Sequence, residues 1–234
     1  MIALCLLVAS SALQASVFQE GVRLAELGKW AEAREKFAAA AAASPGDAAA
    51  WKALGVSAGK LDDYAGAEEA LHRACRLDAK LADACYYWAR SLYVMNRFEE
   101  AVSALRQAMK VEGGRARLWT ALGEAHEAAG RPREAEAAFV KAMSLPYDAQ
   151  ARLRYGVFLY RAGRVEEAAV PLEEAVKRDP RFPAAAAELG RVYYQLGRFS
   201  DAARELERAV ALDPGQETAR LLLGKVRRVQ GTDK

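Results

Sequence analysis

The stretch 51–74, WKALGVSAGKLDDYAGAEEALHRA, contains small and apolar residues that return along the chain at an almost constant interval. Gly55 belongs to a series spaced by 34, 34, 34, 33 and 34 residues: Gly21, Gly55, Ala89, Gly123, Gly156 and Gly190. Further series keep the same frame: Ala33, Ala67, Ala101, Ala135, Ala168 and Ala202; Phe37, Leu71, Leu105, Phe139, Leu172 and Leu206; Ala40, Ala74, Ala108, Ala142, Ala175 and Ala209. A fixed period of this length predicts a stack of repeated units.

Each period holds two helices. Ala33, Phe37 and Ala40 are spaced by four and three residues, as on one face of an α-helix. Turn-forming residues interrupt the pattern inside each repeat, as in Gly-Lys-Trp at 28–30. Prolines such as Pro180 end the second helix, because the residue before a proline avoids the helical region. We therefore expect an all-α protein without a sheet, with the small residues at helix crossings.

These residues resemble the tetratricopeptide repeat, in particular Trp51, Leu54 and Gly55 with their frame-mates Trp119, Leu122 and Gly123. The resemblance implies a right-handed superhelical solenoid of six helix pairs followed by a C-terminal capping helix. The repeats span 14–47, 48–81, 82–115, 116–148, 149–182 and 183–216, and the capping helix and tail span 217–234. The fourth repeat is one residue short, and we expect a tightened loop near Pro146.

Both ends of the chain leave alternatives open. The last helix carries Arg220, Lys225, Arg227 and Arg228, which predicts either a polar cap of the solenoid or a site for an acidic partner. Residues 1–15 have no charged side chain and are typical of a signal peptide, although no basic residue precedes the apolar run. An uncleaved membrane anchor and an apolar first helix that caps the fold are the alternatives. Export to a periplasmic or extracellular space, in a bacterial setting, is the favoured interpretation, with a cytoplasmic location as the alternative.

Composition and motif searches point away from catalysis. The balance of 34 Lys+Arg against 31 Asp+Glu leaves +3, without the basic excess of a nucleic-acid binder. Two histidines and three cysteines are too few for a disulfide framework or a conventional zinc module. His126-Glu127 lacks a second histidine one turn later, so it does not form a metal-binding pair. We expect no enzyme activity, no metal and no cofactor.

Several residues are predicted to have structural roles. His126 reads as a half-buried packing residue, and His72 as a solvated residue on the outside of a second helix. Pro171 interrupts a helical pattern and predicts a local kink. Cys75 and Cys85 fall on neighbouring helices, where they are either small packing residues or a disulfide.

By resemblance to the family, one stripe of each first helix lines a concave groove where peptides dock. The groove residues to which we assign binding are Lys52, Tyr86, Arg90, Tyr93, Arg117, Tyr160, Arg191 and Tyr194. Tyrosine and arginine are enriched at binding hot spots, and these side chains have no evident packing need. Tyr86, Arg90 and Tyr93 share one helix face and are expected to form one cluster, which Tyr160, Arg191 and Tyr194 extend. Bracing of adjacent helices is the alternative role of the tyrosines.

The expected function is therefore a non-enzymatic scaffold that binds a protein or peptide segment in this groove. The family's clamp for an acidic C-terminal tail is not expected, since no repeat has Asn at its ninth position. The alternative is a structural assembly component, a homo-oligomer or a subunit of an envelope complex, that uses the solenoid ends or the convex face. The partner is a protein or peptide; nucleic acid is not expected, and a membrane is involved only through an uncleaved N-terminal segment.

Overall fold

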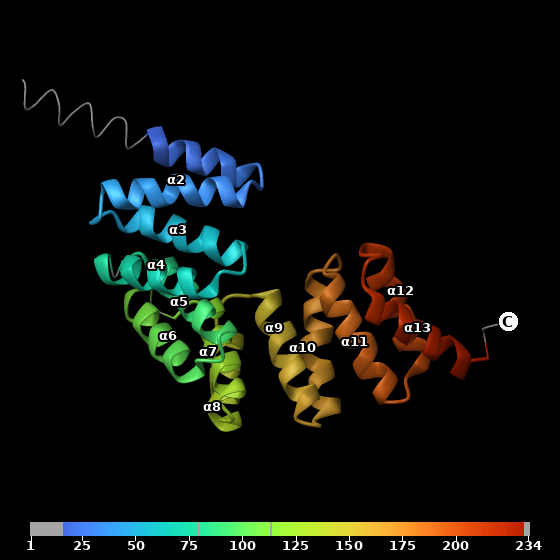
Figure 1. Ribbon diagram of the computed structural model, residues 1–234. Helices are drawn as coiled ribbons and strands as arrows, with labels where there is room; N and C mark the ends of the chain where they lie inside the picture. Colours follow the sequence, from blue (N-terminus) through green and yellow to red (C-terminus); the bar gives the residue numbers. More distant parts are fainter. Residues whose placement is uncertain (1–15, 79, 113, 232–234) are drawn as a thin grey trace, which may run out of the picture. The chain divides into compact units, whose positions relative to one another are not determined.

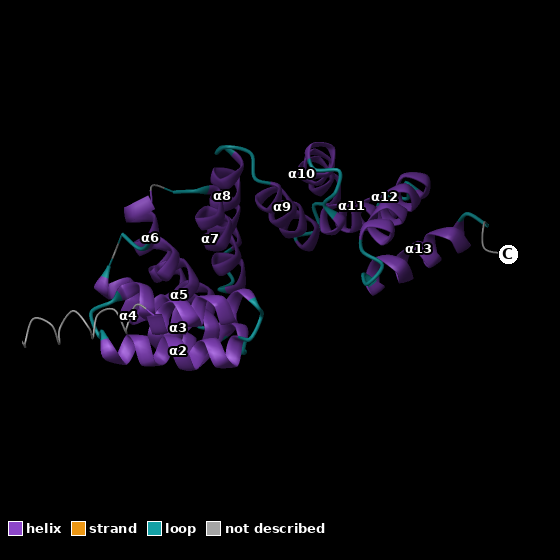
Figure 2. Cartoon of the chain, turned by 90° about the horizontal axis from the view of Figure 1, so that it is seen from above, coloured by secondary structure: helices purple, strands orange, loops and turns teal. Residues whose placement is uncertain are grey.

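The computed structural model describes residues 16–78, 80–112 and 114–231. Segment 1–15 lies outside the described residues, so its roles as signal peptide, anchor or cap stay predictions. Within the described ranges the regular elements are all helices, joined by short loops (Figure 2). The expected all-α fold without a sheet is confirmed for this part of the chain.

The helices follow one another in pairs (Figure 1). The first covers residues 16–26. It is followed by α2 (Trp30–Ala43), α3 (Ala48–Lys60), α4 (Tyr64–Leu77), α5 (Ala82–Val94), α6 (Phe98–Glu112), α7 (Ala116–Ala128), α8 (Pro132–Met143), α9 (Ala149–Arg161), α10 (Val165–Arg178), α11 (Pro183–Gln195), α12 (Phe199–Leu212) and α13 (Glu217–Val229). The chain forms two compact units, each described by itself, and the boundary between them along the sequence falls between Gly114 and Arg115.

The recurring glycines lie where two helices of one repeat cross. A β-carbon placed on any of them would come within 2.5 to 2.8 Å of the large apolar side chain on the second helix. The pairs are Gly21 with Phe37, Gly55 with Leu71, Gly123 with Phe139, Gly156 with Leu172 and Gly190 with Leu206. Real β-carbons do not approach other atoms so closely, so a missing side chain is what permits the contact. The predicted role of these small residues at helix crossings is confirmed.

The turn inside each repeat needs one residue in the left-handed backbone conformation. Gly28, Gly130, Gly163 and Gly197 supply it, with φ between 72° and 78°. Asp62 and Asn96 hold the same place in repeats two and three, each with φ of 60°. Asn and Asp are the non-glycine residues that best tolerate this region.

The short fourth repeat is accommodated differently from our expectation. Helix α8 has 12 residues, whereas α2, α4, α10 and α12 have 14. The loop that follows spans 144–148, one residue longer than 44–47 or 179–182, so the predicted tightened loop near Pro146 is wrong. Tyr147 fixes this loop: its hydroxyl donates to the Ala175 carbonyl at 3.3 Å, and the Arg152 guanidinium lies 4.5 Å from its ring. The helix is two residues shorter than these counterparts, and the Tyr147 contact holds the connection that replaces its end.

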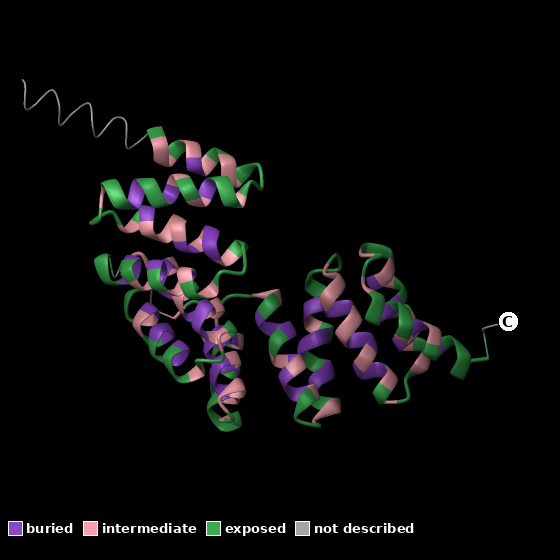
Figure 3. Cartoon of the chain, viewed as in Figure 1, coloured by how far each residue is buried: buried purple, intermediate pink, exposed green. Residues whose placement is uncertain are grey.

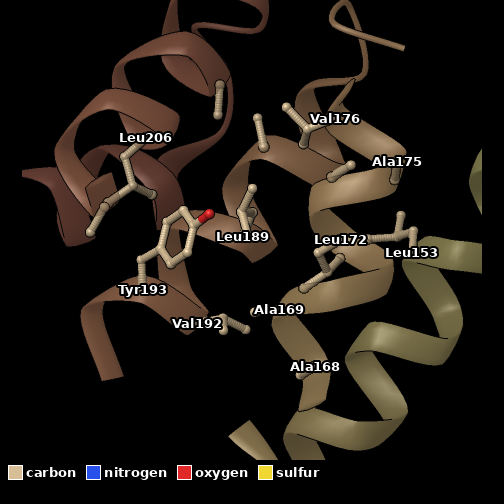
Figure 4. Packing of buried hydrophobic residues seen from close by; sticks show 14 of the residues in the cluster. Leu153, Ala168, Ala169, Leu172, Ala175, Val176, Leu189, Val192, Tyr193 and Leu206 are labelled. Atoms are coloured by element: carbon tan, nitrogen blue, oxygen red, sulfur yellow. The ribbon is translucent and has the colours of Figure 1, made fainter. Parts of the chain in front are cut away.

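Apolar residues of successive helices form the cores (Figure 3). In the second unit one continuous cluster runs from α8 to α13, and Figure 4 shows its middle part, with Leu172, Leu189 and Val192. Pro171 is buried inside α10, and that helix continues without a break from Val165 to Arg178. The terminal helix α13 buries Leu223 and Val226 while Arg220, Lys225 and Arg228 are exposed, the pattern of a solvated cap.

The structure refines three expectations, for the cysteine pair and for the two histidines. Cys75 and Cys85 are fully buried and joined by a disulfide, with Cα atoms 5.0 Å apart, which selects one of the two alternatives. His72 is not merely solvated, because its ring stacks on Trp88 with centroids 4.3 Å apart. His126 is more deeply buried than expected, with 3% of its surface exposed.

Candidate functional site

The first unit has a hollow on the face of its first helices. It has a volume of about 360 Å³ and is lined by Lys52, one of the residues predicted to bind, together with Val22, Ala25 and Val56. Its remaining lining residues are Glu26, Trp30, Phe37 and Ala53. These residues come from helix 16–26, α2 and α3, so the packing of two consecutive repeats creates the hollow. Its lining is mostly apolar, with one acidic and one basic side chain.

A second hollow, of about 330 Å³, lies between α3, α4 and α5 and shares Val56 with the first. Its other lining residues are Gly55, Gly59, Lys60, Tyr64, Leu71, Tyr87, Arg90, Ser91 and Val94. Gly59 leaves room here, since a β-carbon on it would meet only Ala67, at 3.8 Å. The two hollows together form what we call the repeat 1–3 groove.

Cationic side chains lie along this groove. The Lys60 ammonium sits 5.5 Å from the centre of the Trp30 ring, which links the two hollows. Lys52 lies 3.9 Å from the Asp83 carboxylate of the next first helix. The Arg90 guanidinium is 5.7 Å from the centre of the Tyr93 ring. An apolar floor with ammonium and guanidinium groups at its edge suits a peptide that combines apolar and acidic side chains.

The tyrosines predicted on α5 do not all face this groove. Arg90 lines it, but Tyr86 and Tyr93 do not. The Tyr86 ring meets Tyr87 edge-on at 5.4 Å, and the Tyr93 ring meets Phe98 at 5.5 Å across the turn to α6. The expectation that these rings have no packing need is therefore wrong for both, although each remains partly exposed. Their role in binding stays a prediction.

The predicted residues of the second unit show similar contacts. Tyr194 meets Phe199 at 5.7 Å, the counterpart of the Tyr93–Phe98 pair three repeats earlier. Tyr160 packs against the core, and Arg191 lies 3.3 Å from Glu188 of the same helix. Arg117 is half-buried on α7. That these residues extend the α5 cluster stays a prediction.

Two carboxylates of α7 form ion pairs with arginines of the next first helix. Glu124 pairs with Arg154 at 3.0 Å, and Glu127 with Arg161 at 3.5 Å, both arginines belonging to α9. On this face of the second unit, the charged side chains therefore have more charged partners within the protein than those of the repeat 1–3 groove. An incoming charged ligand would have to displace them.

Sequence reasoning missed several groove residues. They are Trp30, Lys60, Tyr64, Tyr87 and Val94. On α5 a signal was present, because Tyr87, Arg90, Ser91 and Val94 follow the spacing of one helix face. Trp30, Lys60 and Tyr64 flank the turns inside repeats, and only tertiary packing brings them to the groove.

The described part of the chain was compared with the requirements for a metal site and for a membrane-spanning helix. Among residues 16–231, excluding 79 and 113, no three His, Cys, Asp or Glu side chains gather in a way that could hold a metal ion. In the same part of the chain, no helix combines the length and apolar character that a membrane span requires.

Paired helices in a fixed frame, with a groove on their first-helix face, define a helical-repeat protein. Two family profiles, each described as tetratricopeptide repeat, match it: one at 18–82, 86–144 and 120–186, the other at 159–226. The chain belongs to the tetratricopeptide repeat family. A comparison with curated proteins found no match.

Solved structures share this fold. YrrB, "a TPR protein with an unusual peptide-binding site", is 22% identical, with a TM-score of 0.54 over 81% of this chain and 97% of that one. PilW, described as a "widely conserved type IV pilus biogenesis factor", is 24% identical, with a TM-score of 0.68 over 80% and 87%. PilF of Pseudomonas aeruginosa is 20% identical, with a TM-score of 0.71 over 93% and 99%. At these identities the likeness concerns the fold alone.

Proposed function

We propose that this protein is a non-catalytic scaffold that binds a peptide or an extended protein segment in the repeat 1–3 groove. The observation that carries the proposal is the pair of connected hollows, which share Val56 and are lined by three consecutive first helices. A ligand that lies across successive first helices can place one side chain in each hollow. The presence of a peptide-binding protein, YrrB, among the structures of similar fold is consistent with this use.

The ligand is expected to carry apolar side chains next to an acidic group. Val22, Ala25 and Val56 offer apolar contacts in the first hollow. Lys60 and Arg90 line the second hollow and supply donors for a carboxylate. Burial of two apolar side chains provides most of the affinity at about 25 cal/mol per Å², and the charged pair fixes the direction of the segment.

We also propose that the protein works in an oxidising compartment outside the cytoplasm. The support is the Cys75–Cys85 disulfide, because such bonds persist in secreted and periplasmic proteins and are rare in the cytosol. The apolar segment 1–15 agrees with export as a signal peptide.

The binding proposal can be tested without knowing the natural partner. Peptides selected from a random display library on the wild-type protein are measured against Val56→Lys, which puts a charge into both hollows. Ala65→Lys is the matched control, since Ala65 is exposed on α4 and lines neither hollow. We expect Val56→Lys to weaken binding at least tenfold and Ala65→Lys to leave it unchanged. Equal loss in both variants, or no loss in either, contradicts the groove as the site.

A structural assembly role is the second candidate. It is favoured by apolar side chains exposed on the terminal helix α13, where Leu221 is 59% and Val229 is 55% exposed. The fold likeness to a pilus biogenesis factor is compatible with such a role. Sedimentation equilibrium of the purified protein separates the candidates. A concentration-dependent oligomer that dissociates in the Leu221→Lys variant favours the assembly role. A monomer with an intact peptide site favours the scaffold.

A further inference from the structure

A second surface of the first unit lies on helix α4, on residues that the repeat 1–3 groove does not use. A hollow of about 430 Å³ is lined by Glu69, His72, Arg73, Arg76 and Leu77, which we call the α4 surface. These residues alternate with the buried Ala70, Leu71 and Cys75 and therefore lie on the opposite side of the helix. The α4 surface shares no lining residue with either hollow of the groove.

Two tryptophans hold Arg73 and His72 of this surface in place. The Arg73 guanidinium lies 4.1 Å from the centre of the Trp51 ring, and the Trp51 indole N–H donates to the Pro45 carbonyl at 3.0 Å. A guanidinium stacked by its face keeps its N–H groups free to donate at its edge. Stacking thus reduces the conformational entropy that Arg73 loses when it binds an anion.

His72 is held in a similar way, by Trp88 of the neighbouring helix α5. Its ring lies parallel to Trp88, with an interplanar angle of 15°, and the Trp88 indole N–H donates to Glu68 at 3.0 Å. The Cys75–Cys85 disulfide joins α4 to α5 within one turn of this stack. The surface therefore rests on a covalently fixed pair of helices.

The charge of the α4 surface is positive but modest. Arg73 and Arg76 are both exposed, and neither takes part in an ion pair within the described part of the chain. Glu69 offsets one of the two positive charges. Leu77, 43% exposed, adds an apolar contact at the end of the surface. One net positive charge is too little for a nucleic acid, whose binding depends on many phosphate contacts. It suits a short acidic segment of a protein.

We propose that the α4 surface binds an acidic segment of a partner protein, as a docking site separate from the groove. Arg73 and Arg76 donate charge-assisted hydrogen bonds to the carboxylates, and Leu77 contacts an apolar residue beside them. A scaffold with two such surfaces can hold two segments at once, so that each raises the effective concentration of the other.

The probe is a synthetic octaglutamate peptide, which lacks the apolar side chains that the repeat 1–3 groove requires, titrated into the ¹⁵N-labelled full chain. The four tryptophans give separate indole N–H signals, which serve as local reporters. We expect the signals of Trp51 and Trp88 to shift, while Trp119 in the second unit and Trp30 in the groove do not. Arg73→Ala with Arg76→Ala should weaken binding at least fivefold. Arg220→Ala with Lys225→Ala on α13 removes the same charge elsewhere and should leave the affinity within twofold.

Equal weakening by both double variants would show an unspecific charge effect and overturn the proposal. So would shifts confined to Trp30 or Trp119, or a DNA duplex that binds more tightly than the peptide through the same arginines. The outcome is independent of the groove, because Val56→Lys lies outside the α4 surface and should leave octaglutamate binding unchanged.

Discussion

Gly55 lies directly against Leu71: a β-carbon on the glycine would be 2.5 Å from Leu71 Cγ and 3.1 Å from the Ala67 carbonyl oxygen. The contact joins the two helices of repeat two, and its counterparts join those of four other repeats. It explains why a residue with poor helix propensity recurs in the middle of a helix. The approach of the second helix outweighs the cost of glycine, which is about 1 kcal/mol relative to alanine.

Gly55→Ala should therefore destabilise the protein. Leu71 and the α4 backbone must move to admit the methyl group, which typically costs about 1–3 kcal/mol and exceeds the gain in helix propensity. The measurement is the urea midpoint of unfolding. Gly224→Ala is the matched control: it occupies the same place in the frame on α13, and nothing lies within 4 Å of its added β-carbon. That variant should be stabilised by about 0.5–1 kcal/mol. Shifts of the same sign in both variants would contradict the crossing role.

Loss of the disulfide should weaken the first unit. Cys75→Ala with Cys85→Ala removes a crosslink over a sequence separation of 10 residues, which corresponds to about 3 kcal/mol in the chain-entropy description. Wild-type protein in dithiothreitol should lose similar stability, and the double variant should not respond to the reductant. Thiol titration of the denatured, unreduced full chain should find one thiol, that of Cys5, out of three cysteines. Three reactive thiols would contradict the bond.

Asn96 occupies a turn that glycine fills in other repeats, with φ of 60°. Asn96→Ala should lower the free energy of unfolding by about 1 kcal/mol, because a β-carbon without a local polar group disfavours this backbone region. Asn96→Gly should stay within about 1 kcal/mol of the wild type. Thermal unfolding of the two variants side by side checks the expected order. An alanine variant as stable as the glycine variant would disprove the backbone argument.

The Tyr193 hydroxyl should make the free energy of unfolding fall at alkaline pH. Burial, followed by the hydrogen bond that this hydroxyl donates to Glu173 at 2.8 Å, raises the pKa of Tyr193 to about 12. The folded state therefore holds this proton more tightly than the unfolded state, whose pKa is about 10. The stabilisation is complete below pH 10 and is lost as the pH rises towards 12, up to about 2 kcal/mol. Tyr193→Phe should lack this decline, and parallel pH profiles of the two proteins would refute the assignment.

The repeat frame, the helix pairs, the glycine crossings and the turn positions can be predicted from the amino-acid sequence, because each depends on residues that are close together in the chain. Helical spacing, proline and left-handed turn residues act locally, and their recurrence every 33 or 34 residues leaves little freedom for another fold. Even the place of the cysteine pair on adjacent helices followed from the frame.

The contacts that a residue makes with other helices depend on tertiary packing. Spacing within α5 put Tyr86, Arg90 and Tyr93 on one face, but packing turned Arg90 to the groove and Tyr93 against Phe98. The shortened repeat lost helix rather than loop, and Tyr147 in that loop reaches α10, a contact 28 residues away. Such contacts depend on the rotation of one helix against the next and on the side chains that fill the space between them, and a linear period does not specify either.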